Sequence, residues 1–504
     1  MSENTYQVIA MVAYFALMIG IGWWGYRRTK DFDDYMIGGR SLGPLPTALS
    51  AGASDMSGWL LMGLPGALYA SGLVELWIAV GLTVGAWLNW RYVAPRLRTY
   101  TVVAGNAITI PSFFGNRLHD TTKLLRMLSG IIILAFFTFY VSSGMVAGGV
   151  FFQSAYGWSY TQGLLLVSAI VVAYTLAGGF IAVVYTDTVQ GLMMVVALIA
   201  VPVAGMIYLG GPGATIDAVQ AVDPHALALW GAGTTAVGVI SALAWGLGYF
   251  GQPHIIVRFM ALRSAGEAKS ARRIGIGWMI LAALGAAGTA LVGIGVFQRD
   301  PTKLPDAETV FIELGKLLFH PLIGGLLLAA ILAAIMSTIS SQLLVSSSAL
   351  VEDLYRSFSR RQLSNRAAVA HGRAAVLAVS LLALALAWQQ NDTILDLVAF
   401  AWAGFGASFG PIVLLSLYWK RLTSWGALAG MAVGAITVAV WGNLSGGILD
   451  IYEILPGFAF NLVIAVAVSL LSPAPPDEVT AEFDEHLRLV SDFETSEPIA
   501  GPTS

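Results

Sequence analysis

Long apolar stretches recur along the chain from Tyr6 to Leu471, and short polar segments separate them. A helix needs about 20 mostly apolar residues to cross a bilayer. A strand of a membrane barrel would instead alternate polar and apolar residues over about ten positions. The pattern therefore predicts an all-α polytopic membrane protein with about 13 transmembrane helices, at residues 6–26, 42–70, 72–93, 125–152, 159–184, 187–209, 233–257, 273–296, 317–350, 372–388, 395–418, 426–443 and 455–471.

The composition is that of a chain that lies mostly in lipid. Hydrophobic residues make up 57% of the 504 residues and charged residues only 11%, whereas charged residues make up about 25% of an average soluble domain. The net charge of −3 provides no basic surface for nucleic acid. The sequence has no cysteine, which excludes disulfides and thiolate chemistry. No catalytic cluster or output domain is recognisable, so we expect neither an enzyme nor an obligate protein partner.

Lysine and arginine are distributed unevenly between the predicted loops. Cytoplasmic loops of membrane proteins are enriched in these residues. If the N-terminus lies outside, and residues at helix ends are counted with the adjacent loop, all but three of the 26 Lys and Arg fall on the cytoplasmic side. The cytoplasmic segments would then be 27–41, 91–124, a turn near residue 185, 258–272, 351–371, 419–425 and the tail; the basic residues outside them are Arg299, Lys303 and Lys316. We therefore expect a multi-pass protein of the plasma (bacterial inner) membrane, with an external N-terminus and a cytoplasmic C-terminus.

Two of the predicted spans contain residues that interrupt a helix. The segments Ser41–Trp59 and Ser241–Pro253 are rich in glycine and contain proline, and both residue types weaken a helix. Interrupted helices at matching positions of two halves are typical of transporter binding sites. Because the two segments are five spans apart, they predict two five-helix repeats of opposite orientation. Close helix packing is an alternative explanation for the same glycines.

These patterns divide the chain into six parts. The repeats occupy residues 41–209 and 233–418, and an external loop at 210–232 separates them. The remaining parts are an N-terminal extra helix and cytoplasmic loop at 1–40, two C-terminal helices at 419–472, and a cytoplasmic tail at 473–504. The tail is acidic and contains proline, a composition that predicts disorder.

Two acids within or beside the predicted spans are candidates for an ion path. Asp55 lies in the middle of an apolar span, where an ionisable residue is a functional candidate by default. It is also placed to cap a half-helix that begins after the break. Asp187 lies at a predicted span boundary, where an ion-path role and a helix cap are alternatives.

The ninth span carries a polar face. Sodium, as a hard cation, prefers oxygen ligands, and one helix face collects such groups at positions i, i+3, i+4 and i+7. Hydroxyls in membrane helices also bond back to their own helix, which leaves the structural interpretation open. The residues of this face are Ala334, Ser337, Thr338 and Ser341, with Ser340 beside them.

Aromatic residues mark a possible substrate wall. Trp245, Tyr249 and Pro253 are spaced four apart and share one face if the segment is helical. Tyr140 is a lone hydroxyl within an apolar run, although tyrosines in membrane helices are more often core or interfacial residues. The interrupted second span adds Trp59 and backbone amide donors near Ser57.

Several of these segments resemble the sodium/solute symporter family: Gly38–Gly43, Thr47–Gly66, Tyr185–Gln190 and Trp245–His254. The resemblance extends over essentially all of the predicted spans and implies a LeuT-type core of 5+5 inverted repeats, with Na+ as the coupling ion. The second of these runs favours the members that transport L-proline. The resemblance therefore implies a secondary active transporter in the lipid bilayer that couples inward sodium flow to proline uptake by alternating access. A sodium-coupled symporter of another small amino acid or carboxylate is the alternative.

The resemblance also implies roles for individual residues. Sodium would be held by the carbonyls of Ala53, Met56 and Ala334 and by the hydroxyls of Ser337 and Thr338. The proline pocket or its gate would include Tyr140, Trp245, Tyr249 and Pro253. The interrupted second span itself offers Ser57, Trp59 and Gly63 to the substrate. A possible second sodium or ion path would involve Asp55, Asp187, Ser340 and Ser341. Arg40 would act in gating at the inner side, although a positive-inside anchor explains it equally well.

Overall fold

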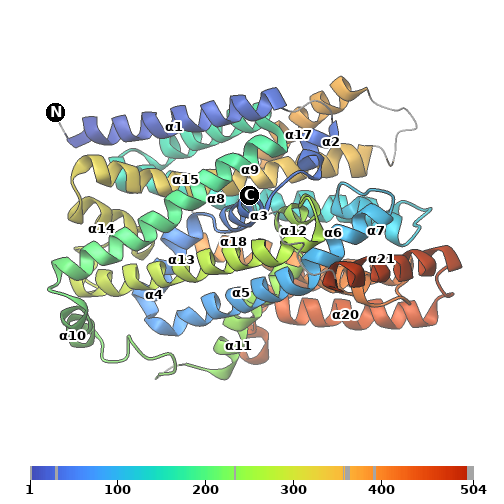
Figure 1. Cartoon of the computed structure of the whole chain (residues 1–504). Coiled ribbons are helices and arrows are strands. Elements are labelled where there is room, and N and C mark those ends of the chain that lie inside the picture. Colours follow the sequence, from blue (N-terminus) through green and yellow to red (C-terminus); the bar gives the residue numbers. More distant parts are fainter. Residues whose placement is uncertain are drawn as a thin grey trace.

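The computed structural model describes residues 3–28, 32–231, 234–355, 357, 364–389 and 393–495. These residues form helices and include no strand (Figure 1). The helices are α1 Glu3–Arg28, α2 Phe32–Ile37, α3 Pro44–Asp55, α4 Leu64–Ser71, α5 Leu76–Leu88, α6 Ala94–Val103, α7 Ile110–Arg117, α8 Leu124–Tyr156, α9 Tyr160–Tyr208, α10 Pro212–Val222, α11 Ala236–Ala244, α12 Pro253–Met260, α13 Ala268–Phe297, α14 Val310–Leu318, α15 Pro321–Ser348, α17 Asn365–Leu386, α18 Ile394–Tyr418, α19 Ser424–Trp441, α20 Ile454–Leu471 and α21 Asp477–Thr495.

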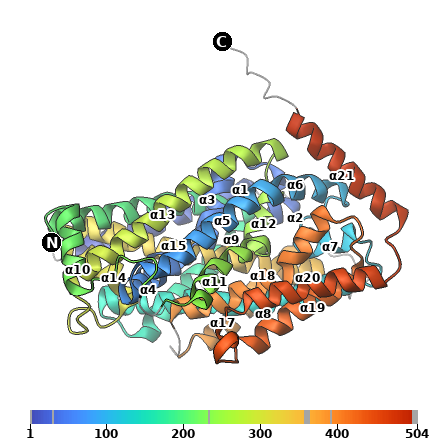
Figure 2. The same ribbon diagram turned by 90° about the horizontal axis from the view of Figure 1, so that it is seen from below.

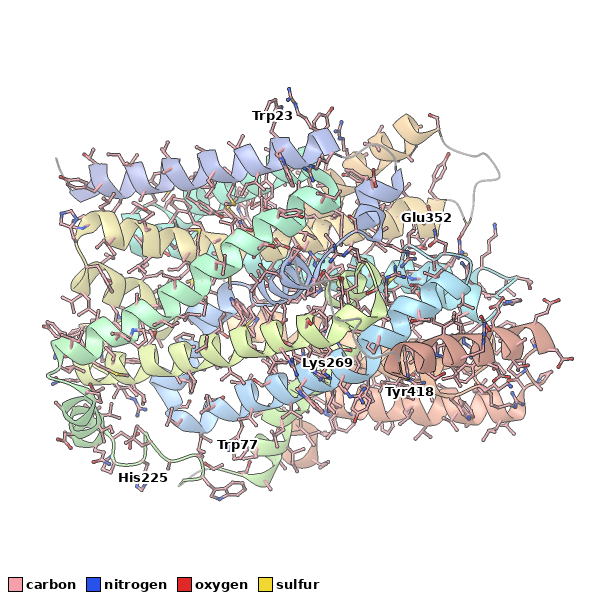
Figure 3. The ribbon with its side chains drawn as sticks, in the orientation of Figure 1. Trp23, Trp77, His225, Lys269, Glu352 and Tyr418 are labelled. Carbon is pink, nitrogen blue, oxygen red and sulfur yellow. The ribbon has the colours of Figure 1, made fainter. Side chains whose placement is uncertain are left out.

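The long helices lie side by side in one bundle (Figures 1 and 2). In the most apolar stretch of α15, 83% of the residues are buried, against 22% for α1. Trp23 of α1 projects from the outer surface (Figure 3) and is more than half exposed. A helix that is apolar on its exposed face requires lipid there, so α1 is peripheral and α15 is surrounded by protein.

Ten helices in the described part of the chain are long and apolar enough to cross a membrane. They correspond to ten of the thirteen predicted spans. The other three, at 42–70, 159–184 and 233–257, are broken into shorter helices or joined to a neighbour. The all-α prediction is therefore confirmed, whereas the count of thirteen stays a prediction.

Helix α9 shows where one predicted turn was misplaced. Its 49 residues contain one non-helical position, Gly179, at φ 66°. A Cβ there would lie 2.7 Å from the ring of Tyr35, so both the backbone conformation and the close approach require glycine. The turn predicted near residue 185 is wrong, because the chain is helical there. As a result, Asp187 lies inside a helix and does not cap one.

The prediction of a disordered tail is also wrong for residues 477–495, which form α21 at the end of the bundle (Figure 2). Val479, Phe483, His486 and Val490 are buried. They recur at the spacing of one helical face, a pattern that the acidic composition obscured. The His486 ring stacks on that of Tyr100 with centroids 4.0 Å apart. Burial, with Arg96 and Arg117 nearby, lowers the pKa of His486 to about 4.

Candidate ion and substrate site

The first interruption separates α3 from α4. Helix α3 ends at Asp55 because Met56 turns away from helical geometry, at ψ 80°. The Ser57 amide then donates to the carbonyl of Asp55 at 3.0 Å. A wider π-helical turn, Trp59–Gly63, leads into α4. The last carbonyls of a helix lack backbone partners, so this break presents acceptor oxygens in the middle of the bundle.

The hydroxyl face of α15 lies against those oxygens. Ser337 Oγ donates to the carbonyl of Ala53 at 2.7 Å and to that of Ala334 at 3.0 Å. Thr338 Oγ1 lies 3.4 and 3.2 Å from the same two carbonyls. Four of the five predicted sodium ligands therefore meet in one buried cluster. The fifth, the carbonyl of Met56, lies at the break itself.

This cluster contains neutral oxygens only. Two carbonyls and two hydroxyls form a hard donor set of the kind that replaces the hydration shell of a small cation. The hydroxyls now donate to the carbonyls, so a cation between them would require the hydroxyl protons to turn outward.

Asp55 lies next to the cluster and is 1% exposed. The Tyr249 hydroxyl donates to its Oδ2, while its Oδ1 has no hydrogen-bond partner. The Asp55 carbonyl accepts from the Tyr140 hydroxyl and from Trp59 Nε1, both at 3.3 Å. Asp55 thus connects this oxygen cluster with three of the residues predicted to contact substrate.

The second interruption separates α11 from α12. A 3₁₀ turn, Trp245–Phe250, follows α11, and Pro253 begins α12. Trp402 of α18 supports the turn, because its Nε1 donates to the Trp245 carbonyl at 2.8 Å. A Cβ on Gly248 would lie 1.9 Å from that nitrogen, so only glycine fits. Sequence reasoning did not identify Trp402, a single tryptophan in the middle of an apolar span.

The breaks bring an aromatic cluster together. The rings of Trp59 and Trp245 have centroids 6.5 Å apart, and Tyr249 packs edge-on against Trp402 at 5.2 Å. Tyr140 packs against His254 at 5.9 Å. Together with Ser57, whose Oγ accepts from the Trp59 amide at 3.4 Å, these residues form an apolar wall beside polar backbone.

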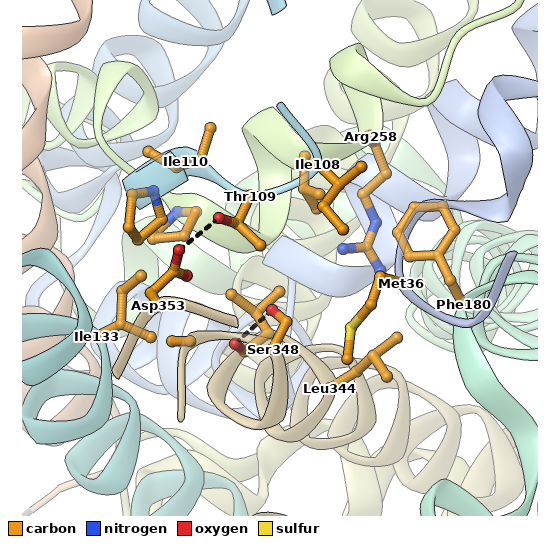
Figure 4. A pocket seen from close by; sticks show the side chains of 15 residues that line it. Met36, Ile108, Thr109, Ile110, Ile133, Phe180, Arg258, Leu344, Ser348 and Asp353 are labelled. Atoms are coloured by element: carbon orange, nitrogen blue, oxygen red, sulfur yellow. Dashed lines mark hydrogen bonds between the residues drawn. The ribbon is translucent and has the colours of Figure 1, made fainter. Parts of the chain in front are cut away.

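Two predicted substrate residues lie away from this wall, on opposite sides. Gly63 lines an open groove of about 590 Å³, together with Glu308. Pro253 lines a small cavity of about 20 Å³ (Figure 4), which has room for about one water molecule. Thr109 donates to Asp353 across that cavity at 2.9 Å. The residues of the wall are buried and line neither the groove nor the cavity.

Glu308, which lines the groove, is hydrogen-bonded to the start of α18. Its carboxylate accepts from the amides of Ile394 at 3.1 Å and Leu395 at 3.4 Å, which are free donors at the start of that helix. Glu308 lies between the membrane spans. Burial raises its pKa to about 7, and the negative charges of Asp306 and Asp396 add to the effect, while the two amide bonds oppose it.

Asp187 lies in a second buried cluster. Its Oδ2 accepts from Ser50 Oγ at 2.7 Å and Ser341 Oγ at 3.3 Å, and Arg258 Nη2 lies 3.2 Å away. The predicted partner Ser340 does not join it, because its hydroxyl donates to the Ser337 carbonyl of its own helix at 3.0 Å. The charge count had assigned Arg258 to a cytoplasmic loop; its side chain is 1% exposed.

Arg40 connects three segments of the chain. Its guanidinium donates to the carbonyls of Met260 and Ala107, both at 2.8 Å, and to Thr101 Oγ1 at 3.0 Å. These acceptors belong to the end of α12, the end of α6 and the loop that follows α6. A simple membrane anchor would point to lipid headgroups, whereas Arg40 makes these contacts inside the protein.

Comparison with known proteins identifies the family. The model of the sodium:solute symporter family matches residues 35–434. The chain belongs to the sodium:solute symporter family. It is therefore a membrane transporter and not an enzyme, as the sequence predicted. Among its relatives in Bacillus subtilis (strain 168), it is 61% identical to the high-affinity proline transporter PutP, over 93% of this chain and 99% of the relative. It is 52% identical to the osmoregulated proline transporter OpuE, over 93% and 95%.

A further relative is the sodium/proline symporter of Staphylococcus aureus (strain JH9), which is 51% identical over 94% of this chain and 93% of the relative. Among solved structures, a Na+-coupled sialic acid symporter in a substrate-bound outward-open state matches with a TM-score of 0.80 at 19% identity, over 94% of this chain and 99% of that chain. The closed nucleobase-cation-symport transporter MHP1 matches with a TM-score of 0.52 at 15% identity, over 89% and 98%. These structures share the fold, which confirms the predicted LeuT-type architecture.

Proposed function

We propose that this chain couples the inward flow of sodium to the uptake of L-proline by alternating access. The contact of the Ala53 carbonyl with Ser337 and Thr338 carries the proposal, because it joins the interrupted helix to an oxygen-rich face. The names of the relatives supply the solutes: three of them, at 51–61% identity, are named as proline transporters or sodium/proline symporters.

Coupling would follow from the shared break in α3. Sodium held by the carbonyls of Ala53, Met56 and Ala334 and the hydroxyls of α15 would fix the chain at Asp55. The Asp55 carbonyl is bonded to Tyr140 and Trp59, so the same ion would also order the substrate wall. A ligand that fixes a geometry required by a second ligand raises the affinity for it.

The wall suits a small zwitterion with an apolar ring. Amide donors after the break, near Ser57, would bind the carboxylate, as helix N-termini do. The Asp55 carboxylate, with one oxygen unpaired, would accept from the secondary ammonium. The ring of proline would pack on Trp245 and Tyr249. Gly63 would lie on the entry path and Pro253 on the exit path.

The proposed orientation follows from the distribution of basic residues. The N-terminus would lie outside the bacterial inner membrane and the C-terminus, with α21, in the cytoplasm. The open groove beside Gly63 would then face outward, and the contacts of Arg40 would close the inner side. These contacts would have to break when the site opens to the cytoplasm.

Reconstituted liposomes test the proposal directly. An imposed inward sodium gradient should drive accumulation of labelled proline, and an equal potassium gradient should not. A Ser337→Ala/Thr338→Ala variant controls for leakage through the protein. Accumulation without sodium would reject the coupling. Stronger competition by another unlabelled amino acid or carboxylate than by proline would identify a different substrate.

A further inference from the structure

The buried pair Arg258–Asp187 lies one helical turn from the proposed sodium cluster. Ser50 precedes Ala53 by one turn on α3, and Ser341 follows Ser337 by one turn on α15. A turn of helix rises about 5.4 Å. The interface of α3 and α15 therefore has two polar layers. We call Ala53, Ala334, Ser337 and Thr338 the upper layer, and Ser50, Asp187, Arg258 and Ser341 the lower layer.

The lower layer has the form of a cation site that is already filled. Asp187 is fully buried, and its Oδ2 collects Ser50, Ser341 and the guanidinium on one oxygen. The guanidinium in turn donates to both hydroxyls, at 3.0 Å to Ser50 and at 2.6 Å to Ser341. Without Arg258, a carboxylate and two hydroxyls from three helices would remain, which is a donor set suited to sodium.

One oxygen of this site is still unsatisfied. Asp187 Oδ1 is buried and has no hydrogen-bond partner, so the acid retains capacity toward a cation. Arginine does not lose its proton in proteins. A sodium ion in the lower layer would therefore place two cations against one carboxylate, out of contact with water. The fixed positive charge of Arg258 therefore excludes a sodium ion from the lower layer.

We infer that Arg258 is a tethered cation that fills a second cation site formed by Asp187, Ser50 and Ser341, and thereby limits this transporter to one exchangeable sodium ion. The inference rests on the proposed function, because it takes the upper layer as the sodium site. It assigns Arg258 the role of setting ion stoichiometry. A purely structural ion pair between α9 and α12 would stabilise the fold but would leave the number of bound sodium ions unchanged in every variant.

Equilibrium binding of radioactive sodium and labelled proline to the purified protein separates these roles. The parent should bind one sodium per proline. Arg258→Gln removes the fixed charge and keeps a polar group, so it should bind two, and its Hill coefficient for sodium should rise from about 1 toward 2. Arg258→Lys restores a cation and should return the ratio to one. Arg258→Gln/Asp187→Asn lacks both charges and should also bind one.

A second readout applies if Arg258→Gln binds proline poorly. Ligands that bind only the folded state raise its melting temperature. Sodium without proline should therefore raise the melting temperature of Arg258→Gln more than that of the parent, and adding Ser341→Ala should reduce the difference. Two sodium ions per proline in the parent, or one in Arg258→Gln, would overturn the inference. Failure of the parent to bind sodium and proline together would reject the proposed function instead.

Discussion

The two layers between α3 and α15 are equally buried but differ in charge. The upper layer consists of neutral oxygens, whereas the lower layer contains a carboxylate and a guanidinium. The backbone explains the difference. Helix α3 is broken after Asp55, so carbonyls are available in the upper layer. At Ser50 the helix is regular, its carbonyls are used by the helix, and only side chains remain as ligands.

This difference relates local structure to function. A site of neutral oxygens binds a small cation reversibly, because the empty site leaves no unpaired charge. A buried site that contains a carboxylate requires a cation at all times. In the lower layer, Arg258 is the cation that pairs with Asp187. The upper layer is therefore suited to an ion that is exchanged in each cycle, and the lower layer to one that stays.

The largest effect is expected from breaking the charge balance of the lower layer. Asp187→Asn leaves Arg258 buried without a counter-ion, which should cost about 3–5 kcal/mol of stability. Chemical denaturation in detergent, followed by tryptophan fluorescence, measures the loss. Sodium should not restore it, because the surplus charge is positive. Asp187→Asn/Arg258→Gln serves as the matched control and should lose much less; if it is as unstable as Asp187→Asn, the charge balance is not the cause.

The next effect tests whether substrate binds beside the upper layer. Trp245→Ala removes a ring that packs near Trp59 and against Trp402. Truncating a buried aromatic contact costs about 2 kcal/mol, so the Kd of proline should rise roughly 30-fold. The sodium concentration for half-maximal binding, measured at saturating proline, should change less than about twofold. Trp425→Ala, on the exposed face of α19, is the control; equal effects of the two substitutions would place the substrate elsewhere.

Removing one oxygen from the upper layer should have a smaller effect. Ser337→Ala or Thr338→Ala deletes one neutral ligand, worth about 1 kcal/mol. The half-saturating sodium concentration should rise about fivefold, and proline affinity should largely recover at saturating sodium. Ser346 lies further along α15, and its hydroxyl donates to its own helix at Gln342, so Ser346→Ala should behave like the parent. An unchanged sodium dependence in both Ser337→Ala and Thr338→Ala would exclude the upper layer as the ion site.

The smallest effect lies outside both layers and separates proton effects from sodium effects. The pKa of Glu308 is raised to about 7 where it contacts α18, so this contact holds a proton more tightly than the free side chain does. The contact is therefore favoured below pH 7 and weakens as pH rises through that value. Hydrogen exchange of residues 393–397, corrected for intrinsic rates, should accelerate between pH 6 and 8 in the parent. Glu308→Gln should abolish the acceleration; if it persists there, another group is responsible.

The sequence predicted the interrupted helices and the hydroxyl face of α15 because the relevant signals are local, whereas the carbonyls of Ala53 and Ala334 were assigned as ligands by the family resemblance. Glycine and proline mark the breaks, and Ser337 and Thr338 stand out in an apolar span. The lower layer depends on four helices that meet only in the folded chain. Arg258 had been counted as a loop residue, since a charge count assigns any basic residue near a span end to the adjacent loop.

Two other differences have similar causes. The acidic composition of the tail led to the prediction of disorder, although Phe483 and His486 are spaced so that they share one helical face. That face packs against Tyr100 of α6, and this contact exists only in the folded chain. Trp402 has no polar neighbour in sequence, so nothing local distinguished it from a core residue. Its role as a support of the second break depends on contact with Gly248.

Equilibrium binding of labelled proline to the purified parent protein, with sodium titrated against choline at constant ionic strength, tests the central claim most directly. In the proposed mechanism, sodium in the upper layer would fix the break at Asp55 and would thereby order the substrate wall. The account therefore predicts that saturating sodium lowers the Kd of proline by about 5–150-fold, and that proline raises sodium affinity by the same factor. Proline binding that is independent of sodium would contradict it.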